Sequence, residues 1–178
     1  KAIQRSNDIY FYLLGRKLGP EKIKKWAELF GFQNTTNIGL SESVGIIPSS
    51  FWKEDTLGER WFLGDTYNLS IGQGYVATTP LQIARATAVF ANGGYLCEPK
   101  LLKSQSNNDV SCKKLPISTD TYDLIREGMH QACLSGGTGY PFFDFSILQQ
   151  NDNVIDRQQS DADSQQSNNP TMQQLNSA

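Results

Sequence analysis

The chain is poor in the residues that build metal centres. Its 178 residues include one histidine and three cysteines, and Cys97, Cys112 and Cys133 lack the short spacings of metal ligands. Because an odd count argues against a full disulfide framework, we expect three ordinary free or buried thiols. His130 has no second histidine or cysteine at ligand spacing, so we expect a structural or exposed side chain there. The sequence predicts neither a metal site nor a cofactor.

Excess charge and long apolar runs are also missing. The chain has 16 Lys and Arg against 18 Asp and Glu, a net charge of −2, which excludes a broadly basic nucleic-acid-binding protein. No apolar stretch approaches the roughly 18–20 residues of a membrane span, and no signal peptide precedes the first apolar run. Because the chain starts at Lys1 without an initiator methionine and ends in a low-complexity run, we expect an internal piece of a longer protein.

The two parts of the chain differ sharply in composition. Residues 149–178 contain 8 Gln, 5 Asn, 4 Ser and 4 Asp, with only six scattered apolar residues. Such a segment cannot bury enough apolar surface to offset its ordering entropy. Residues 1–148 have ordinary globular composition. We therefore expect one partial domain over 1–148 and a disordered, Gln/Asn/Ser/Asp-rich insertion over 149–178.

Four stretches carry the start and stop signals of helices. They cover residues 6–18, 20–30, 79–91 and 118–133, each opening with capping residues or proline, and the first two are followed at once by glycine. The third has a narrow apolar stripe, which we expect to pack closely against another helix. The residues of this stripe are Leu81, Ala84, Ala88 and Ala91.

The remaining segments read as loops and strands. Residues 31–74 are punctuated by Gly, Pro, Ser and Asn, which predicts a loop-rich excursion with few regular elements. Residues 95–102 resemble a strand interrupted by Pro99, and residues 103–114 a polar hairpin or loop. Helices and strands in separate runs predict an α+β fold.

One ordered series of motifs is specific. Ser6-Asn7-Asp8 stands at a helix start, where these residues alone would be read as a cap. About 60 residues later comes GDTYNLSIGQGYVATTPLQIA over 64–84, followed by ANGG over 91–94 and GGTGY over 136–140. This series resembles the transpeptidase domain of class B penicillin-binding proteins, closest to the elongation type called penicillin-binding protein 2. The similarity covers residues 1 to about 147.

The resemblance implies a fold and a reaction. The expected fold is a fragment of the penicillin-binding, serine-transpeptidase architecture, with a helical subdomain and part of an antiparallel sheet. Family members cross-link peptidoglycan stem peptides with three motifs, S-x-x-K, S-x-N and K-T-G. The serine attacks a D-alanyl carbonyl, an acyl-enzyme forms, and an acceptor amine resolves it. Penicillin mimics the D-Ala-D-Ala end and stays attached.

The resemblance assigns catalytic roles to two residues of this chain. Ser6, the serine of S-x-N, would relay a proton between the lysine and the leaving nitrogen. Asp8, where the family has Asn or Asp, would hold the lysine ammonium and orient the substrate amide. Residues 72–74 would support the site from behind, and Thr138 and Tyr140 would lead into the strand beside it.

The nucleophile and K-T-G motifs are expected to lie outside the chain. Ser111-Cys112-Lys113-Lys114 matches S-x-x-K in letters, but it follows the S-x-N in a polar loop, and we interpret it as chance. The chain alone is therefore expected to be inactive. A non-catalytic relative, a β-lactam sensor or scaffold of the same fold, is the alternative.

The resemblance also implies partners and a location. The expected ligands are stem peptides with D-Ala-D-Ala ends and β-lactams, and the expected protein partners are the cell-elongation machinery, with no nucleic acid. The parent protein would be anchored in the bacterial cytoplasmic membrane, with this domain on its outer side.

Overall fold

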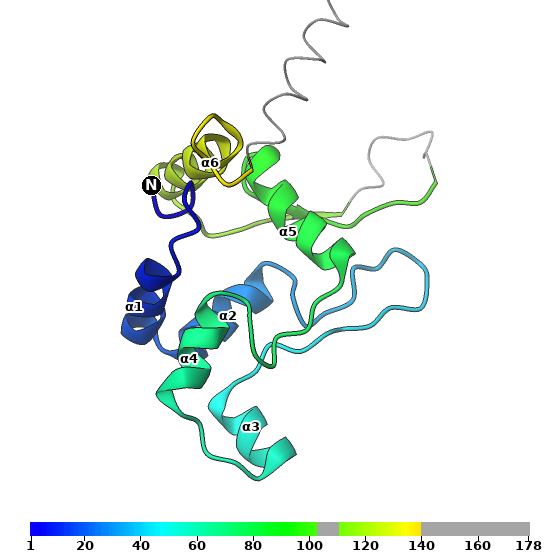
Figure 1. Ribbon diagram of the computed structural model, residues 1–178. Helices are drawn as coiled ribbons and strands as arrows, with labels where there is room; N and C mark the ends of the chain where they lie inside the picture. Colours follow the sequence, from blue (N-terminus) through cyan, green and yellow to red (C-terminus); the bar gives the residue numbers. More distant parts are fainter. Residues whose placement is uncertain (103–110, 140–178) are drawn as a thin grey trace, which may run out of the picture.

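The computed structural model describes residues 1–102 and 111–139 (Figure 1). The expected insertion at 149–178 lies outside these residues. The described elements are, in order, α1 (Asp8–Leu18), α2 (Pro20–Leu29), α3 (Ser50–Leu57), α4 (Leu63–Ser70), α5 (Pro80–Ala91), β1 (Tyr95–Cys97), β2 (Cys112–Lys114) and α6 (Thr119–Cys133). Helices with one small antiparallel sheet confirm the expected α+β class.

The capping signals in the sequence mark true helix starts. Thr79 Oγ1 accepts from the Gln82 amide at 3.1 Å, and the Thr79 amide donates to Gln82 Oε1 at 2.9 Å, which is a complete capping box for α5. Ser118 caps α6 by accepting from the Thr121 amide at 3.3 Å. Pro20 occupies the first turn of α2 as expected.

The segment 31–74 is more regular than expected. It contains α3 and α4, each of eight residues. A helix of two turns shows too little of the 3.6-residue period to be recognised by its apolar spacing. Ser49 begins α3 by accepting from the Trp52 amide at 3.1 Å. The expectation of few regular elements is therefore wrong for the second half of this segment.

Helix α5 buries a different face from the one expected. The alanines expected to pack against another helix are exposed, at Ala84, Ala88 and Ala91. The buried residues are instead Gln82, Ala86 and Val89. Gln82 is 2% exposed, because its Nε2 donates to the carbonyls of Asn34 and Val44, both at 2.9 Å. A satisfied buried amide, which apolar periodicity cannot show, selects this face.

The sheet covers one end of α5. Strands β1 and β2 pair antiparallel, with Tyr95 opposite Lys114 and Cys97 opposite Cys112. Strand β1 ends at Cys97, earlier than the expected 95–102. The core cluster lies between the hairpin and the helices around it. Its members are Val89, Leu96 and Leu115, with Phe30 and Ile117 packed against them.

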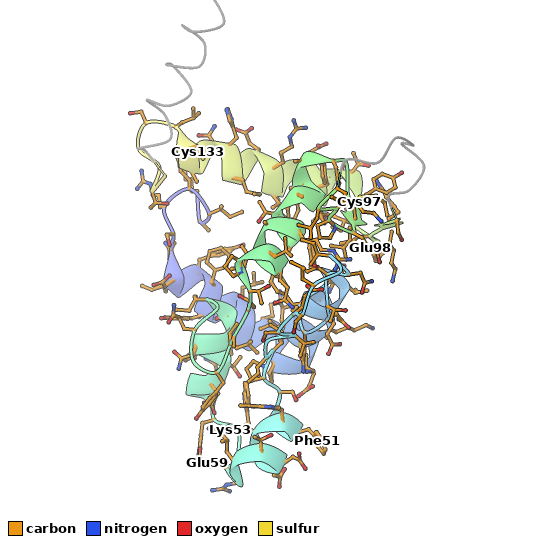
Figure 2. The ribbon with its side chains drawn as sticks, turned by 90° about the vertical axis from the view of Figure 1, so that its right-hand side faces the viewer. Phe51, Lys53, Glu59, Cys97, Glu98 and Cys133 are labelled. Atoms are coloured by element: carbon orange, nitrogen blue, oxygen red, sulfur yellow. A yellow bond between two sulfur atoms is a disulfide. The ribbon has the colours of Figure 1, made fainter. Side chains whose placement is uncertain are left out.

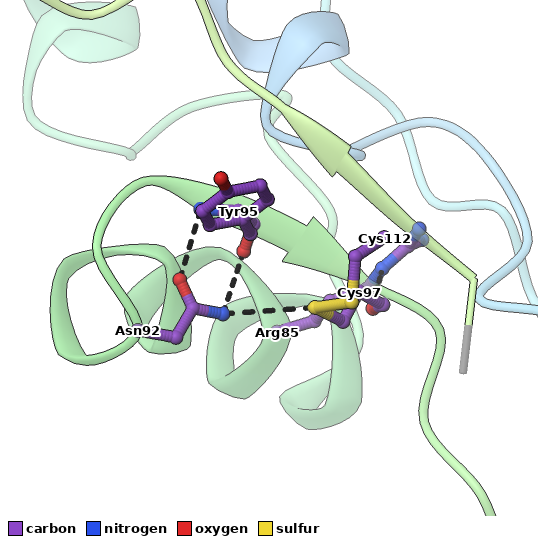
Figure 3. The surroundings of a disulfide bond; sticks show 5 residues. All are labelled: Arg85, Asn92, Tyr95, Cys97 and Cys112. Carbon is purple, nitrogen blue, oxygen red and sulfur yellow. Dashed lines mark hydrogen bonds between the residues drawn. A yellow bond between two sulfur atoms is a disulfide. The ribbon is translucent and has the colours of Figure 1, made fainter. Parts of the chain in front are cut away.

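The sequence-based expectation of three free thiols is wrong. Cys97 and Cys112 form a disulfide across the hairpin (Figure 3), and Cys133 is free and exposed. The Glu98 amide donates to the Ser111 carbonyl at 2.9 Å, and hydrogen-bonded pairs alternate along an antiparallel ladder, so the cysteines next to them occupy a non-hydrogen-bonded pair. Side chains approach each other most closely at such pairs. Register brings the two thiols together, and register is invisible in cysteine spacing.

Loss of this disulfide is expected to lower the stability of the domain. A cross-link that closes a loop of about 15 residues contributes about 3 kcal/mol. The sequence separation here is 15. The paired substitution Cys97→Ser and Cys112→Ser should lower the free energy of unfolding by about that amount, measured by urea denaturation. Cys133→Ser is the matched control and should change little; equal stability of both variants would contradict the prediction.

Helices α1, α2 and α4 form a second packed group away from the hairpin. Helix α1 packs against α4 and α2, and α5 packs against α6 (Figure 1). Helix α1 crosses α4 closely at Gly15, where a Cβ would overlap Ser70. None of the helices within 1–102 and 111–139 is long and apolar enough to cross a membrane.

Candidate functional site

Ser6 sits in an unusual backbone turn at the entrance to α1. Its amide donates to the Ile3 carbonyl at 3.1 Å, and the Asn7 amide donates to the Ala2 carbonyl at 3.0 Å. This pair of bonds is the Schellman arrangement that closes a helical turn, and the residue at its corner adopts a left-handed conformation. Ser6 has φ +47° at that corner, a position that favours glycine. A non-glycine residue held there signals a local constraint.

The cap of α1 is Asn7 rather than Ser6. Asn7 Oδ1 accepts from the Tyr10 amide at 3.0 Å. The hydroxyl of Ser6 is exposed and makes no hydrogen bond with the residues that the structure describes. Ser6 therefore does not cap α1, so the simple interpretation of this serine as a helix cap is wrong.

Asp8 is the first residue of α1. Its side chain is exposed and forms no ion pair within the described part of the chain. A carboxylate in the first turn faces the partial positive charge of the helix N-terminus. Ser6 and Asp8 thus flank the cap at one helix end, and both side chains are open to a third group.

The glycine turn after α6 lies against the segment that carries Ser6. The Thr138 amide donates to the Gln4 carbonyl at 3.1 Å, and the Gly139 amide donates to the Ala132 carbonyl at 2.8 Å. Two motifs more than a hundred residues apart in sequence are therefore neighbours in the fold. Tyr140 lies outside the described residues.

The glycines of 72–74 serve a more distant part of the molecule. They follow α4, where the Gln73 amide donates to the Asn68 carbonyl at 2.8 Å. Gly72 also lines a cavity of about 300 Å³ together with Ile23 and Leu69. The turn reaches α1 only through α4, which packs directly on that helix.

The most buried charge of the described residues is Lys53 on α3. Its side chain is 4% exposed, and Nζ lies 2.9 Å from Asp65 Oδ2 and 3.3 Å from Glu59 Oε2. Figure 2 shows Lys53 and Glu59 together at the α3 end of the molecule, with Phe51 on the other side. The hydrogen bond to Asp65 raises the pKa of Lys53 despite its burial. This group ties α3 to the start of α4 and holds Lys53 as an ammonium.

Ser50-Phe51-Trp52-Lys53 is a second letter match to S-x-x-K that the sequence-based interpretation missed. Like the family's nucleophile it stands at a helix start, yet it follows Ser6 in the chain instead of preceding it. A lysine that activates a serine must be able to lose its proton. Lys53 is bound to two carboxylates and has a raised pKa, so it cannot do so readily. We therefore assign Ser50 and Lys53 a structural role rather than a catalytic one.

The chance interpretation of Ser111 also has a structural reason. The lysine three residues on, Lys114, lies with its Nζ 4.4 Å from the centre of the Tyr95 ring and donates to the Gly93 carbonyl. Ser111 precedes β2 and Lys114 is the last residue of that strand, so the pair lies on an exposed hairpin rather than at a buried helix start. His130 is exposed on α6, and the described ranges hold no group of three metal-ligating side chains.

Asp65 gives the Lys53 group a defined acid sensitivity. Burial opposes ionisation, but hydrogen bonds from the Phe62 amide and from Lys53 outweigh it and lower the pKa of Asp65. A carboxylate whose pKa is lower in the folded state stabilises the fold above its unfolded-state pKa, near 4, and loses that contribution as pH falls through its folded-state pKa. The stabilisation by Asp65 is therefore complete at neutral pH.

The expected result is a pH-dependent difference between wild type and Asp65→Asn. Urea unfolding should show a constant loss of stability in the variant near pH 7 and a shrinking loss below about pH 4. Asp55→Asn, at an exposed aspartate of α3, the helix that carries Lys53, is the control. A difference that stays the same from pH 7 to pH 3 would show that Asp65 does not act through its charge.

Comparison with known proteins gives a consistent set of matches. The family model described as the penicillin binding protein transpeptidase domain matches residues 1–148. The chain is 32% identical over 154 residues to the peptidoglycan D,D-transpeptidase MrdA of Salmonella typhimurium, covering 80% of this chain and 25% of that protein. The chain thus spans about a quarter of the length of that relative.

Solved structures agree with the sequence matches. The penicillin-binding protein PBP2 of Helicobacter pylori superposes with a TM-score of 0.70 at 35% identity, covering 78% of this chain and 26% of that one. A complex between PBP2 and MreC from the same organism gives a TM-score of 0.69, at the same identity and coverage. The described elements therefore have the arrangement found in these transpeptidase domains.

Proposed function

The chain belongs to the penicillin-binding protein transpeptidase family, and from this membership we propose that it is part of a peptidoglycan D,D-transpeptidase. The whole protein would cross-link stem peptides through a serine acyl-enzyme and would bind penicillin. The observation that carries the proposal is Ser6, at the S-x-N position of the family. Its hydroxyl is exposed and unengaged by the described residues, on a left-handed backbone turn.

The chemistry assigned to the two site residues follows from their groups. A serine hydroxyl donates and accepts at once, so Ser6 can pass a proton from the nucleophile's lysine to the leaving nitrogen. The Asp8 carboxylate can hold that lysine by a charge-assisted hydrogen bond. The nucleophile, its lysine and the K-T-G strand would come from parts of the protein outside this chain. On this proposal residues 1–148 form a partial domain and 149–178 an insertion, in line with the end of the family match at 148.

The disulfide supports a location outside the cytoplasm. Disulfides persist in oxidising compartments such as the periplasm and the cell surface and are rare in the cytosol. The Cys97–Cys112 bond therefore fits a domain on the outer side of the cytoplasmic membrane, held there by an anchor elsewhere in the protein. The H. pylori PBP2 is found in complex with MreC. On this basis we propose contact with the cell-elongation machinery, beside the stem-peptide and β-lactam ligands.

Labelling with a fluorescent penicillin tests the function. A full-length protein that contains this chain should give a covalent band on a denaturing gel, because its nucleophile is acylated. The 178-residue chain alone should give none. A full-length protein that takes up no label would favour a non-catalytic scaffold. Labelling of the chain alone that disappears in Ser111→Ala or Ser50→Ala would overturn the assignment of the nucleophile to another part of the protein.

A further inference from the structure

The N-terminal turn rests on the middle of α6. Residues 1–5 lie beside this helix in Figure 1. At Gly128 a Cβ would lie 2.9 Å from Ile3 Cδ1 and 3.3 Å from Ile3 Cβ, closer than side chains ordinarily pack. Glycine within a helix is disfavoured relative to alanine. Gly128 therefore has a packing purpose, which is to let Ile3 lie against the helix backbone.

The turn after α6 holds the same segment from a second side. The Thr138 amide donates to the Gln4 carbonyl at 3.1 Å. The turn is itself pressed onto α6, since the Gly139 amide donates to the Ala132 carbonyl and a Cβ at Gly137 would overlap that carbonyl. Ile3 and Gln4 are thus fixed by contacts that come from one element and the turn that follows it.

These contacts act on Ser6 through the backbone. The carbonyl of Ile3 accepts the Ser6 amide, so any shift of Ile3 moves the corner of the turn. A left-handed serine persists only where its surroundings hold it in place. Apart from the bonds within the turn itself, the Thr138–Gln4 bond is the one backbone hydrogen bond to residues 3–5 within the described part of the chain.

We propose that Gly128 is a positioning residue for acyl transfer: with the Thr138–Gln4 hydrogen bond, it sets the position of the Ser6 hydroxyl through Ile3. The inference rests on the proposed transpeptidase function. It adds a role for α6, a helix that contributes no motif residue of its own. Displacement of a catalytic group by about an ångström can slow a reaction about a hundredfold.

The test is Gly128→Ala in the full-length protein, with penicillin acylation measured at increasing concentration. The added methyl pushes Ile3 outward, so the acylation rate constant should fall about 10–100-fold, while the half-saturating penicillin concentration changes little. The melting temperature should change little, because the helix preference of alanine offsets the cost of displacing Ile3. Gly64→Ala is the matched control, since Gly64 also lies in a helix but has nothing within 4 Å of its Cβ position.

A second substitution tests the route through Ile3. Ile3→Val removes the Cδ1 atom that the new methyl meets, so Gly128→Ala with Ile3→Val should recover most of the acylation rate. Wild-type labelling with a Gly128→Ala rate within twofold of it would refute the inference and leave the proposed function standing. Absence of labelling in wild type would refute the function itself. Loss of folding in Gly128→Ala, or failure of Ile3→Val to rescue a folded variant, would also refute the positioning role.

Discussion

Replacement of Ser6 by alanine in the full-length protein is expected to slow acylation by penicillin about 10²–10⁴-fold, the usual effect of losing a positioned proton-transfer group. Stability should change little, because Ser6 does not cap α1 and its hydroxyl has no partner among the described residues. Stopped-flow acylation and thermal unfolding measure the two effects. Acylation within threefold of wild type together with a lower melting temperature would show a purely structural serine.

Glycine at the same position separates catalysis from folding further. The left-handed conformation of Ser6 costs roughly 1–2 kcal/mol for an L-residue, while glycine adopts it freely at a smaller cost in unfolded-chain entropy. Ser6→Gly should therefore raise the free energy of unfolding by about 0.5–1 kcal/mol and still abolish fast acylation. A variant that is more stable and less active would identify the strain at Ser6 as a property kept for the reaction.

The largest expected loss of stability follows Gly45→Ala. Gly45 has φ +70°, and a Cβ there would overlap the carbonyl oxygen of Ala77. That oxygen accepts the Ile46 amide at 2.7 Å in an antiparallel bridge, so the clash cannot be relieved without breaking it. Backbone strain and overpacking together should cost about 3 kcal/mol or more.

Gly39→Ala provides the matched comparison for Gly45→Ala. Gly39 has φ +87° but nothing within 4 Å of its Cβ position, so only the backbone term remains. Urea unfolding should show a loss of about 1–2 kcal/mol for Gly39→Ala, well below that for Gly45→Ala. Equal losses in the two variants would mean that the contact with Ala77 contributes nothing.

The sequence predicts helices well where capping residues close in sequence mark the ends of the helix. Thr79 and Gln82 form the expected box, and Ser118 caps α6 as expected. These signals act over three or four residues, so they do not depend on the rest of the fold. The short helices α3 and α4 escaped prediction because two turns carry too little periodicity.

Two other misjudged features, the buried face of α5 and the state of the cysteines, depend on residues distant in sequence. Gln82 chooses the buried face of α5 through carbonyls some 38 and 48 residues away. Cys97 meets Cys112 only because strand register places them opposite each other. Such contacts leave no periodic trace in the sequence, so composition and spacing favoured free thiols and an alanine face.

The candidate site shows the same division. The position of Ser6 and Asp8 at a helix start follows from local signals, whereas the neighbourhood of Thr138 and Gln4 does not. The Ser50 and Lys53 pair shows a different source of error, because it matches the S-x-x-K motif in sequence while its lysine cannot activate a serine. Only the ion pairs of Lys53 reveal that its proton is held.

The Cys97–Cys112 bond also makes the pairing of β1 with β2 independent of the length of the loop that connects the two strands. The covalent link fixes which residues of β1 and β2 face each other, whatever joins them. Loop-closure entropy grows only slowly with length, about 0.6 kcal/mol per doubling. Evolution can therefore lengthen or rewrite the connection between Pro99 and Ser111 while Leu96 and Leu115 keep their places in the core. The connection of the hairpin can in this sense acquire new sequence while the core around it keeps its structure.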